Sequence, residues 1–254
     1  MKNKKILWLQ LLTAAVVLAI IEFVVRIGWV NELYLASPSS TLKGLIELFA
    51  RGKLIYHFSV TLAEFFIGFS LAAIVGISFG LFLAISRKAE IFFTPFLSAL
   101  MSIPKSAIIP LLILWLGIGF ANKVFVAFLA GFFIITFNTL TGVKGTPENL
   151  IKVGKVFEAT RRQMIWKILL PAAVPSIFTG LRLAATLGLV MTLFSEMFAS
   201  KVGLGNLLTI AVQYYNTPQL FAIIVVVTLL SVAITQTIHL LEVKIFSKWR
   251  GTDA

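Results

Sequence analysis

The sequence has no cysteine, only 2 histidines and only 10 acidic residues in a chain of 254. The absence of cysteine excludes disulfides, thiolate catalysis and cysteine metal sites. His57 and His239 are far apart in the sequence and the acidic residues are scattered, so no shared metal or catalytic centre is expected. Zinc-protease, serine-hydrolase and phosphate-binding loop motifs are also absent, which excludes ATP hydrolysis by a Walker-type mechanism. We therefore expect no enzyme, no catalytic residue, no metal and no cofactor bound by this chain.

Charge is scarce as well, since only 13% of the residues are charged and 59% are hydrophobic. The mean hydropathy of +1.00 is typical of an integral membrane protein. The net charge of +12 does not indicate nucleic acid, because no basic groove interleaved with aromatic residues is present. The apolar run that begins at Ile6 is too long for a signal peptide and lacks a small-residue cleavage site. We interpret it as a retained first span.

Six segments reach the roughly 20 mainly apolar residues that a transmembrane helix needs. The sequence thus predicts an all-α integral membrane protein with spans at Ile6–Gly28, Val60–Ile85, Ile91–Leu116, Val124–Val143, Ala172–Met197 and Leu220–Val243. Residues 29–59 and 198–219 are expected to be loops. Prolines 95, 104 and 110 predict that the third span is kinked or interrupted. Small residues predict close helix packing at Gly68, Gly76, Gly80, Gly131, Gly180 and Gly188.

The distribution of Lys and Arg predicts the orientation, because cytoplasmic loops carry an excess of both. With a cytoplasmic N-terminus, the larger set faces the cytoplasm: Lys2, Lys4, Lys5, Arg87, Lys88, Lys144, Lys152, Lys155, Arg161, Arg162, Lys167, Lys244, Lys248 and Arg250. The smaller set faces outward: Arg26, Lys43, Arg51, Lys53, Lys123 and Lys201. We expect a multi-pass protein of the cell membrane with both termini cytoplasmic.

The polar segment 146–171 lies between two of these apolar runs. Its five basic residues are too costly to place in hydrocarbon, so the segment must leave the bilayer. Its apolar residues nevertheless recur at helical spacing, at Ile151, Val156, Phe157, Met164 and Ile165. A basic, amphipathic, helical loop of this kind is a docking surface for lipid or for a soluble partner.

Five ionisable residues lie within or near the spans, namely Glu22, Glu64, Lys105, Arg182 and Glu196. Charge inside a membrane is costly and indicates function by default, while the alternative is a side chain that snorkels to an interface. Glu22 is close to a span end and is interpreted as structural. For Glu64, Lys105, Arg182 and Glu196 both interpretations stay open.

We assign Lys105, Asn138, Arg182 and Glu196 to a translocation pathway or gate. Lys105 lies between two prolines, where freed carbonyls can open a polar lining that suits an anion. Asn138 is expected to form hydrogen bonds between helices. Arg182 and Glu196 are about 21 Å apart along one helix and cannot pair with each other. Each should find a partner on another helix or in a water-filled cavity, with Glu196 at the outer gate and Arg182 at the inner half of a dimer interface.

Several stretches together resemble the membrane permease subunits of ABC importers, specifically the nitrate/sulfonate/taurine type. The resemblance covers nearly the whole chain after the first span and is carried by Ser37–Leu48, Ile67–Arg87, Ile103–Gly119, Phe137–Val143, Leu169–Arg182, Ser195–Met197 and Gly203–Leu208. It implies a type I importer permease fold, with a first span plus outer loop at 1–55 and a five-span core at 56–250. The polar segment 146–171 would then be the cytoplasmic coupling loop.

The same resemblance implies the partners. Such permeases dimerise, most simply as a homodimer, and their coupling loop docks into a separate ATPase subunit that binds ATP and Mg²⁺. A binding protein delivers a small polar or anionic solute on the outer face. The residues implied in coupling are Gly154, Phe157, Glu158, Ala159, Thr160 and Pro171.

The loop also departs from the family pattern. Counting back from Pro171 places Glu158 at the usual glycine, while Gly154 falls at the end of the usual Glu-Ala-Ala. Loss of that glycine removes a residue suited to positive φ, so the chain either turns differently there or continues as a helix. A stand-alone secondary transporter is the alternative function, but it needs inverted repeats and coupling carboxylates, and no repeat is visible.

Overall fold

The computed structural model describes residues 2–247, and all regular secondary structure in that range is helical. Lys248 and Arg250, and with them the end of the predicted 56–250 core, lie outside the described residues. Five helices are long and apolar enough to cross a membrane, and a bent pair of helices provides a sixth crossing when counted as one span. The predicted six-span architecture is confirmed in that form.

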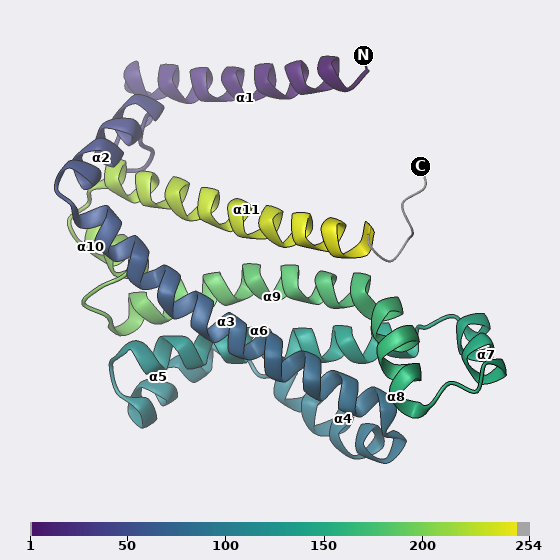
Figure 1. Ribbon diagram of the computed structural model, residues 1–254. Helices are drawn as coiled ribbons and strands as arrows, with labels where there is room; N and C mark the ends of the chain where they lie inside the picture. Colours follow the sequence, from purple (N-terminus) through teal and green to yellow (C-terminus); the bar gives the residue numbers. More distant parts are fainter. Residues whose placement is uncertain (1, 248–254) are drawn as a thin grey trace.

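The helices follow one another along the chain as shown in Figure 1. Their bounds are α1 Lys2–Arg26, α2 Pro38–Ala50, α3 Lys53–Ile85, α4 Arg87–Ser102, α5 Lys105–Leu116, α6 Phe120–Lys144, α7 Glu148–Val156, α8 Arg161–Met164, the π-helix Ile165–Leu169, α9 Leu170–Ala199, α10 Leu204–Gln213 and α11 Thr217–Ser247.

Helix α6 is the centre of the bundle and packs between α3 and α9 (Figure 1). Glycines allow this close contact, as predicted. A Cβ atom at Gly68 would lie 2.6 Å from the Cβ of Ala127, and one at Gly80 would lie 2.5 Å from the carbonyl oxygen of Thr136. Because lipid gives no hydrophobic force between helices, the van der Waals contact that these glycines permit is what holds α3 on α6.

The third predicted span is two helices, α4 and α5, bent by 93°. Pro95 and Pro110 both lie inside helices, and only Pro104 falls at the break. Proline disfavours the helical region for the residue before it, and Ile103 accordingly has an extended backbone with ψ of 128°. One of the three prolines therefore interrupts the span, and the other two are tolerated.

The predicted loops 29–59 and 198–219 contain helices. Ser37 starts α2 because its side chain accepts a hydrogen bond from the Ser40 amide, and Pro38 follows in the first turn, where its missing N–H costs nothing. Helix α10 occupies the centre of the second stretch. Both helices are too short to span a membrane, so a search for spans by the length of apolar sequence does not reveal them.

The two ends of the bundle differ in what they carry (Figure 1). Helices α7 and α8 lie at one end, which we call the α7–α8 end, where α1 begins and α11 finishes. Helices α2 and α10 lie at the opposite end, the α2–α10 end, together with the starts of α3, α6 and α11. The chain thus enters and leaves the bundle at the end that carries the polar segment.

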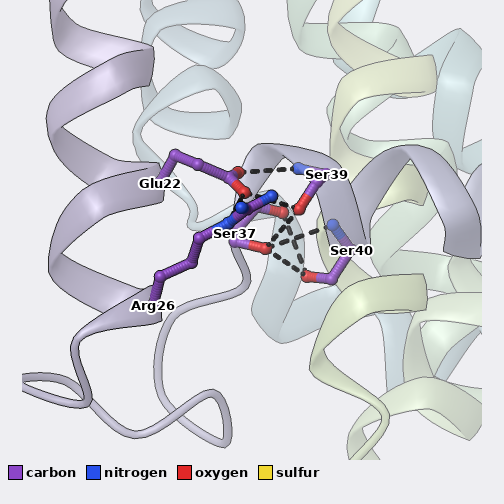
Figure 2. Close-up of polar contacts among 5 residues, drawn as sticks. All are labelled: Glu22, Arg26, Ser37, Ser39 and Ser40. Atoms are coloured by element: carbon purple, nitrogen blue, oxygen red, sulfur yellow. Dashed lines mark hydrogen bonds and ion pairs between the residues drawn. The ribbon is translucent and has the colours of Figure 1, made fainter.

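Helix α1 lies at the edge of the bundle, and no residue of its apolar window is buried. Polar contacts attach its C-terminal end to the start of α2 (Figure 2). Glu22 accepts hydrogen bonds from the Ser39 amide at 3.0 Å and the Ser39 hydroxyl at 2.7 Å, and it forms an ion pair with Arg26 at 2.6 Å. These contacts agree with the structural interpretation of Glu22.

Candidate functional site

The polar segment forms a short two-helix unit at the α7–α8 end. Helix α7 ends at Val156, and the next helix is started by Thr160, whose side chain accepts from the Gln163 amide while the Gln163 side chain accepts from the Thr160 amide. This reciprocal capping box satisfies two donors that the helix start would otherwise leave free. The two helices are therefore joined by a turn of defined geometry.

Glu158 takes over the conformation of the missing glycine. Its φ is +49°, the left-handed region that non-glycine residues rarely adopt. The Ala159 amide donates to the Gly154 carbonyl at 2.9 Å, and the Glu158 amide donates to the Lys155 carbonyl at 3.0 Å. These two bonds make a Schellman motif that ends α7. Of the two alternatives that the sequence left open, the helix does not continue, and the turn is made by a strained glutamate.

Gly154 is buried where α7 crosses the following helices. A Cβ atom there would lie 2.5 Å from Cδ1 of Ile168 and 2.7 Å from Cε of Met164. The other face of the two-helix unit is exposed and apolar, since Val156 is 79% exposed and Phe157 is 81% exposed. Large apolar side chains this exposed, on a segment too basic to lie in hydrocarbon, indicate a surface made to be covered by a partner.

Pro171 lies in the first turn of α9, where a missing amide is tolerated. The turn before it, Ile165–Leu169, is a π-helix, and the Leu170 amide donates to the Ile165 carbonyl. A π-helical turn is rare and marks a local adjustment of the helix, frequently at functional sites. It connects the two-helix unit directly to the long helix α9.

Lys105 begins α5 directly after the break in the third span. Its Nζ donates to the Met101 carbonyl and lies 5.5 Å from the centroid of the Phe133 ring. It borders a hollow of about 260 Å³ that is lined from α4, α5, α6 and α9 by Met101, Lys105, Ser106, Ala130, Phe133, Ile134, Leu187 and Met191. Among the described residues that line this mainly apolar hollow at a broken span, Lys105 alone is ionisable.

Among residues 2–247, Asn138 forms no hydrogen bond to another helix, although the sequence led us to expect one. Its side-chain amide donates to the Ile134 carbonyl of its own helix at 2.8 Å. It faces Gly180 of α9, where an added Cβ would lie 2.7 Å from the Cβ of Asn138. Because α6 and α9 come so close here, the amide turns to the carbonyl one turn earlier in α6. The expectation of an interhelical bond was wrong.

Arg182 finds its partner on another helix, as expected. Its guanidinium forms an ion pair with Glu242 of α11 and also donates to the Thr179 hydroxyl at 3.3 Å. His239 lies 3.5 Å from the same carboxylate. Glu242 was not among the candidates from the sequence, because it falls at the end of an apolar run where a charge is ordinary. The pair connects α9 to α11.

Glu196 lies in a buried polar cluster at the α2–α10 end, and none of its surface is exposed. It accepts hydrogen bonds from the Thr61 hydroxyl and from the Gly205 amide, both at 2.6 Å. Glu64 is 2% exposed, interacts electrostatically with Glu196, and has its Oε2 buried without a hydrogen-bond partner among the described residues. Lys123 is 3% exposed, interacts electrostatically with both carboxyl groups, and donates to the Ala199 carbonyl at 3.1 Å. The structure thus brings together two candidates that the sequence treated separately.

Lys123 was assigned to an outer loop and overlooked as part of this cluster. It follows a glycine-rich turn, and the sequence offered no sign that the start of α6 would be covered by α9. His57 was also missed: its Nδ1 lies 3.0 Å from both the amide nitrogen and the carbonyl oxygen of Gly203. Thr61 accepts from the Leu204 amide at 2.8 Å. Residues of α3 therefore hold the α9–α10 turn in place.

Gly203 is required in that turn for two reasons. Its φ is +105°, and a Cβ atom would overlap the Glu196 carboxyl group, at 2.6 Å from Oε2. The buried Glu196 carboxyl group thus occupies space that is available only because residue 203 has no side chain. The structure does not bring Lys105, Asn138, Arg182 and Glu196 together, and it gives each of the four a different local environment.

The comparisons with known proteins all find membrane components of transport systems. The family model described as "Binding-protein-dependent transport system inner membrane component" matches residues 76–246. The putative aliphatic sulfonates transport permease protein SsuC of Bacillus subtilis is 32% identical over 254 residues, which is 98% of this chain and 91% of that protein. The taurine transport system permease protein TauC of Escherichia coli is 26% identical, over 94% of this chain and 88% of that protein.

A third relative is named for a different solute. The formylaminopyrimidine transport permease protein ThiX of Halalkalibacterium halodurans is 32% identical, over 85% of this chain and 86% of that protein. Among solved structures, an inward-facing MetNI methionine ABC transporter matches with a TM-score of 0.63 at 20% identity, over 78% of this chain and 97% of that one. This likeness supports the fold.

Proposed function

We propose which class of solute this chain transports, which end of it faces the cytoplasm and how it assembles. The chain belongs to the family of binding-protein-dependent transport system inner membrane components. As a member, it is a membrane-spanning permease subunit of an ABC importer and not an enzyme. The alternative of a stand-alone secondary transporter does not fit relatives that are named as ABC transporter permeases. Our proposal is that the solute is a small organic anion and that the α7–α8 end faces the cytoplasm.

The orientation rests on charge. The α7–α8 end carries the basic residues of the polar segment, along with Arg87, Lys88 and Lys144, and the positive-inside bias places such an end in the cytoplasm. Helix α1 begins and α11 finishes at that same end (Figure 1), which supports our proposal that both termini are cytoplasmic. The α2–α10 end is then the outer face, where a binding protein would arrive.

The coupling surface is the exposed side of the α7–α8 unit. Val156 and Phe157 stand out on a rigid turn that is fixed by the Schellman motif and by the capping box. Apolar anchors that enter a partner's pocket are the side chains that typically supply most of the binding energy of an interface. We propose that Phe157 enters a cleft of the ATPase, and that the π-helical turn before Pro171 transmits its movement to α9.

The solute class rests on one observation, the hollow beside Lys105. Among the residues that line it, Lys105 alone is charged, and apolar residues with one serine form the rest. A cation in an apolar hollow suits a ligand with an anionic group and an apolar body, and it disfavours cations. An aliphatic sulfonate has this chemistry, and two of the relatives are named for sulfonates or taurine. A second copy of the chain would complete the passage, so we propose a homodimer.

The experiment is uptake by the permease reconstituted with its ATPase and its binding protein in liposomes. Labelled taurine and an alkanesulfonate are the probes, and Lys105→Met is the variant. Lys105→Met should lower uptake of the sulfonate by about tenfold, which corresponds to about 1.4 kcal/mol, while the ATPase still copurifies. Lys43→Met on α2, away from the hollow, is the matched control and should leave uptake unchanged. Equal uptake by wild type and Lys105→Met would remove the pathway assignment.

A further inference from the structure

The basic residues of α8 and of the π-helix that follows it have no carboxylate partner. Residues 159–195 contain no Asp or Glu, so this stretch supplies none of its own. Within the described part of the chain, residues 2–247, Arg162 and Lys167 form no ion pair, whereas Lys144 at the same end pairs with Glu90. Unpaired cations on one short segment raise the local concentration of anions around it.

Arg162 and Lys167 border one exposed groove, which we call the α8 groove. It measures about 590 Å³ and is lined by Thr160, Arg162, Gln163, Trp166 and Lys167. This volume lies within the roughly 300–1,000 Å³ of sites for small ligands. Guanidinium and ammonium groups are the usual partners of phosphate in proteins. Trp166 is 58% exposed and adds an apolar ring with one N–H donor, so the groove suits an anion that also has an apolar part.

The α8 groove lies on the side of its helix that faces away from α7. Met164 and Ile168 contact Gly154 of α7, where an added Cβ would come within 2.7 Å of the first and 2.5 Å of the second. Arg162 and Trp166 each stand two residues before one of these, which is about half a turn around the helix. The contact between α7 and α8 therefore leaves the groove open.

The ribbon in Figure 1 relates the groove to the bilayer. It turns where the π-helix joins α9, so α8 runs across the end of the bundle while α9 runs along it. The start of α9 lies beside the end of α6, because a Cβ added at Gly142 would be 2.5 Å from the Cβ of Ser176. The adjacent Lys144, paired with Glu90, marks the edge of the hydrocarbon. Helix α8 then lies in the headgroup layer, which is about 5–8 Å thick on each side and is where Trp is enriched.

We propose that the α8 groove binds the headgroup of an anionic phospholipid. The lipid phosphate lies between Arg162 and Lys167, and Trp166 lies where the headgroup meets the acyl chains. The chains enter the hydrocarbon beside α9, which gives a lipid an anchor that a free phosphate ion lacks. Lipid and soluble partner, the two ligands that the sequence left open for the polar segment, then bind different faces of it.

A lipid bound in the groove would hold α8 at the membrane surface while α7 presents Phe157 to the ATPase. This consequence rests on the proposed function, because it assumes that the two-helix unit couples the permease to ATP hydrolysis. The binding of the lipid itself does not depend on that assumption, so the two can be tested separately.

The test titrates dioleoylphosphatidylglycerol into the detergent-solubilised permease–ATPase complex and counts bound lipids by native mass spectrometry. The variant is Arg162→Gln with Lys167→Gln. The matched control is Lys5→Gln with Lys88→Gln, which removes two exposed charges from the same end outside the groove. The double variant should raise the Kd of the first phosphatidylglycerol by at least about tenfold, and the control should leave it unchanged. Binding of dioleoylphosphatidylcholine should be the same in all three proteins.

A second measurement follows ATP hydrolysis stimulated by the binding protein in nanodiscs of phosphatidylcholine with a rising fraction of phosphatidylglycerol. Hydrolysis should rise with that fraction in wild type and stay constant in the double variant. If the lipid affinities change as expected but wild type is not stimulated by the binding protein in any membrane, the proposed function is contradicted and the lipid site is supported.

Four outcomes overturn the proposal. An unchanged Kd in the double variant removes the site, and an equal increase in the control replaces it with general attraction to the basic end. If inorganic phosphate raises the melting temperature of wild type but not of the double variant, and the lipid Kd is unchanged, the groove holds a free anion instead. If the double variant loses the ATPase during purification and keeps its lipid affinity, the groove belongs to the interface with the ATPase.

Discussion

Replacing Gly203 with alanine should destabilise the α2–α10 end more than the loss of one glycine suggests. The backbone of Gly203 has a φ of +105°, and holding alanine there costs about 1–3 kcal/mol. The added Cβ would also overlap the Glu196 carboxyl group. Glu196 cannot move away without losing its 2.6 Å hydrogen bonds from Thr61 and Gly205, and overpacking of this kind costs about 1–3 kcal/mol more.

The two terms together predict a loss of about 2–6 kcal/mol, which lowers the melting temperature by about 5–20 °C for a chain of this length. The assay is thermal unfolding of the purified permease in lipid nanodiscs. Gly117→Ala is the matched control, because Gly117 has a φ of +73° and a ψ of 178°, in the same region as the φ of +105° and ψ of 162° of Gly203, and no atom lies within 4 Å of its added Cβ. That variant therefore measures the backbone term without the overlap.

A second pair of variants isolates the contact with Glu196. In a Glu196→Ala background, Gly203→Ala should cost only the backbone term, and the difference between the two backgrounds is the interaction energy. If Gly203→Ala lowers the melting temperature equally in both backgrounds, the overlap with Glu196 contributes nothing, and the reasoning about the buried cluster is wrong.

Three further predictions concern topology and coupling. Tyr214→Cys at the α2–α10 end and Val156→Cys at the α7–α8 end are each placed where the native side chain is 79% exposed, in a chain without cysteine. An impermeant thiol reagent on intact cells should label only the Tyr214 site, and the reverse pattern contradicts the orientation. Ala159→Arg should prevent copurification of the ATPase, because it adds bulk and an unpaired charge to the docking surface, and normal copurification would move the docking site elsewhere. Glu158→Gly should keep binding-protein-stimulated ATP hydrolysis, whereas Glu158→Val should lower it several-fold, because a β-branched residue is strained at a φ of +49°. Equal activity in these two variants would show that the Schellman turn does not matter for coupling.

The agreement between sequence and structure is best where a feature depends on length and local chemistry. Five long spans follow from the amount of apolar sequence that crosses a bilayer, and the break in the third span follows from the effect of Pro104 on Ile103. The charges of the polar segment are costly in hydrocarbon, and its helices α7 and α8 lie at one end of the bundle (Figure 1). Helices α2 and α10 were missed, since both are shorter than the roughly 20 apolar residues by which a span is recognised.

The turn at Glu158 was predicted from the sequence only in part. The sequence identified the position where glycine is usual but left open whether the helix ends there. The Schellman bonds to Gly154 and Lys155, together with the capping box of Thr160, hold the glutamate in a conformation that it does not prefer. Local strain at one residue was overcome by contacts on both sides of it.

The sequence by itself determined the class of this protein and its apolar crossings of the membrane. Only the tertiary structure decided which polar groups meet. Thr61 and Glu196 are 135 residues apart, Lys123 and Ala199 are 76 apart, and Arg182 and Glu242 are 60 apart. Hydrophobicity sets how deep a helix lies, but the rotation of each helix about its axis depends on how small residues such as Gly68 and Gly80 pack against their neighbours. A charge within a span can be recognised from the sequence, but its partner is determined by that packing.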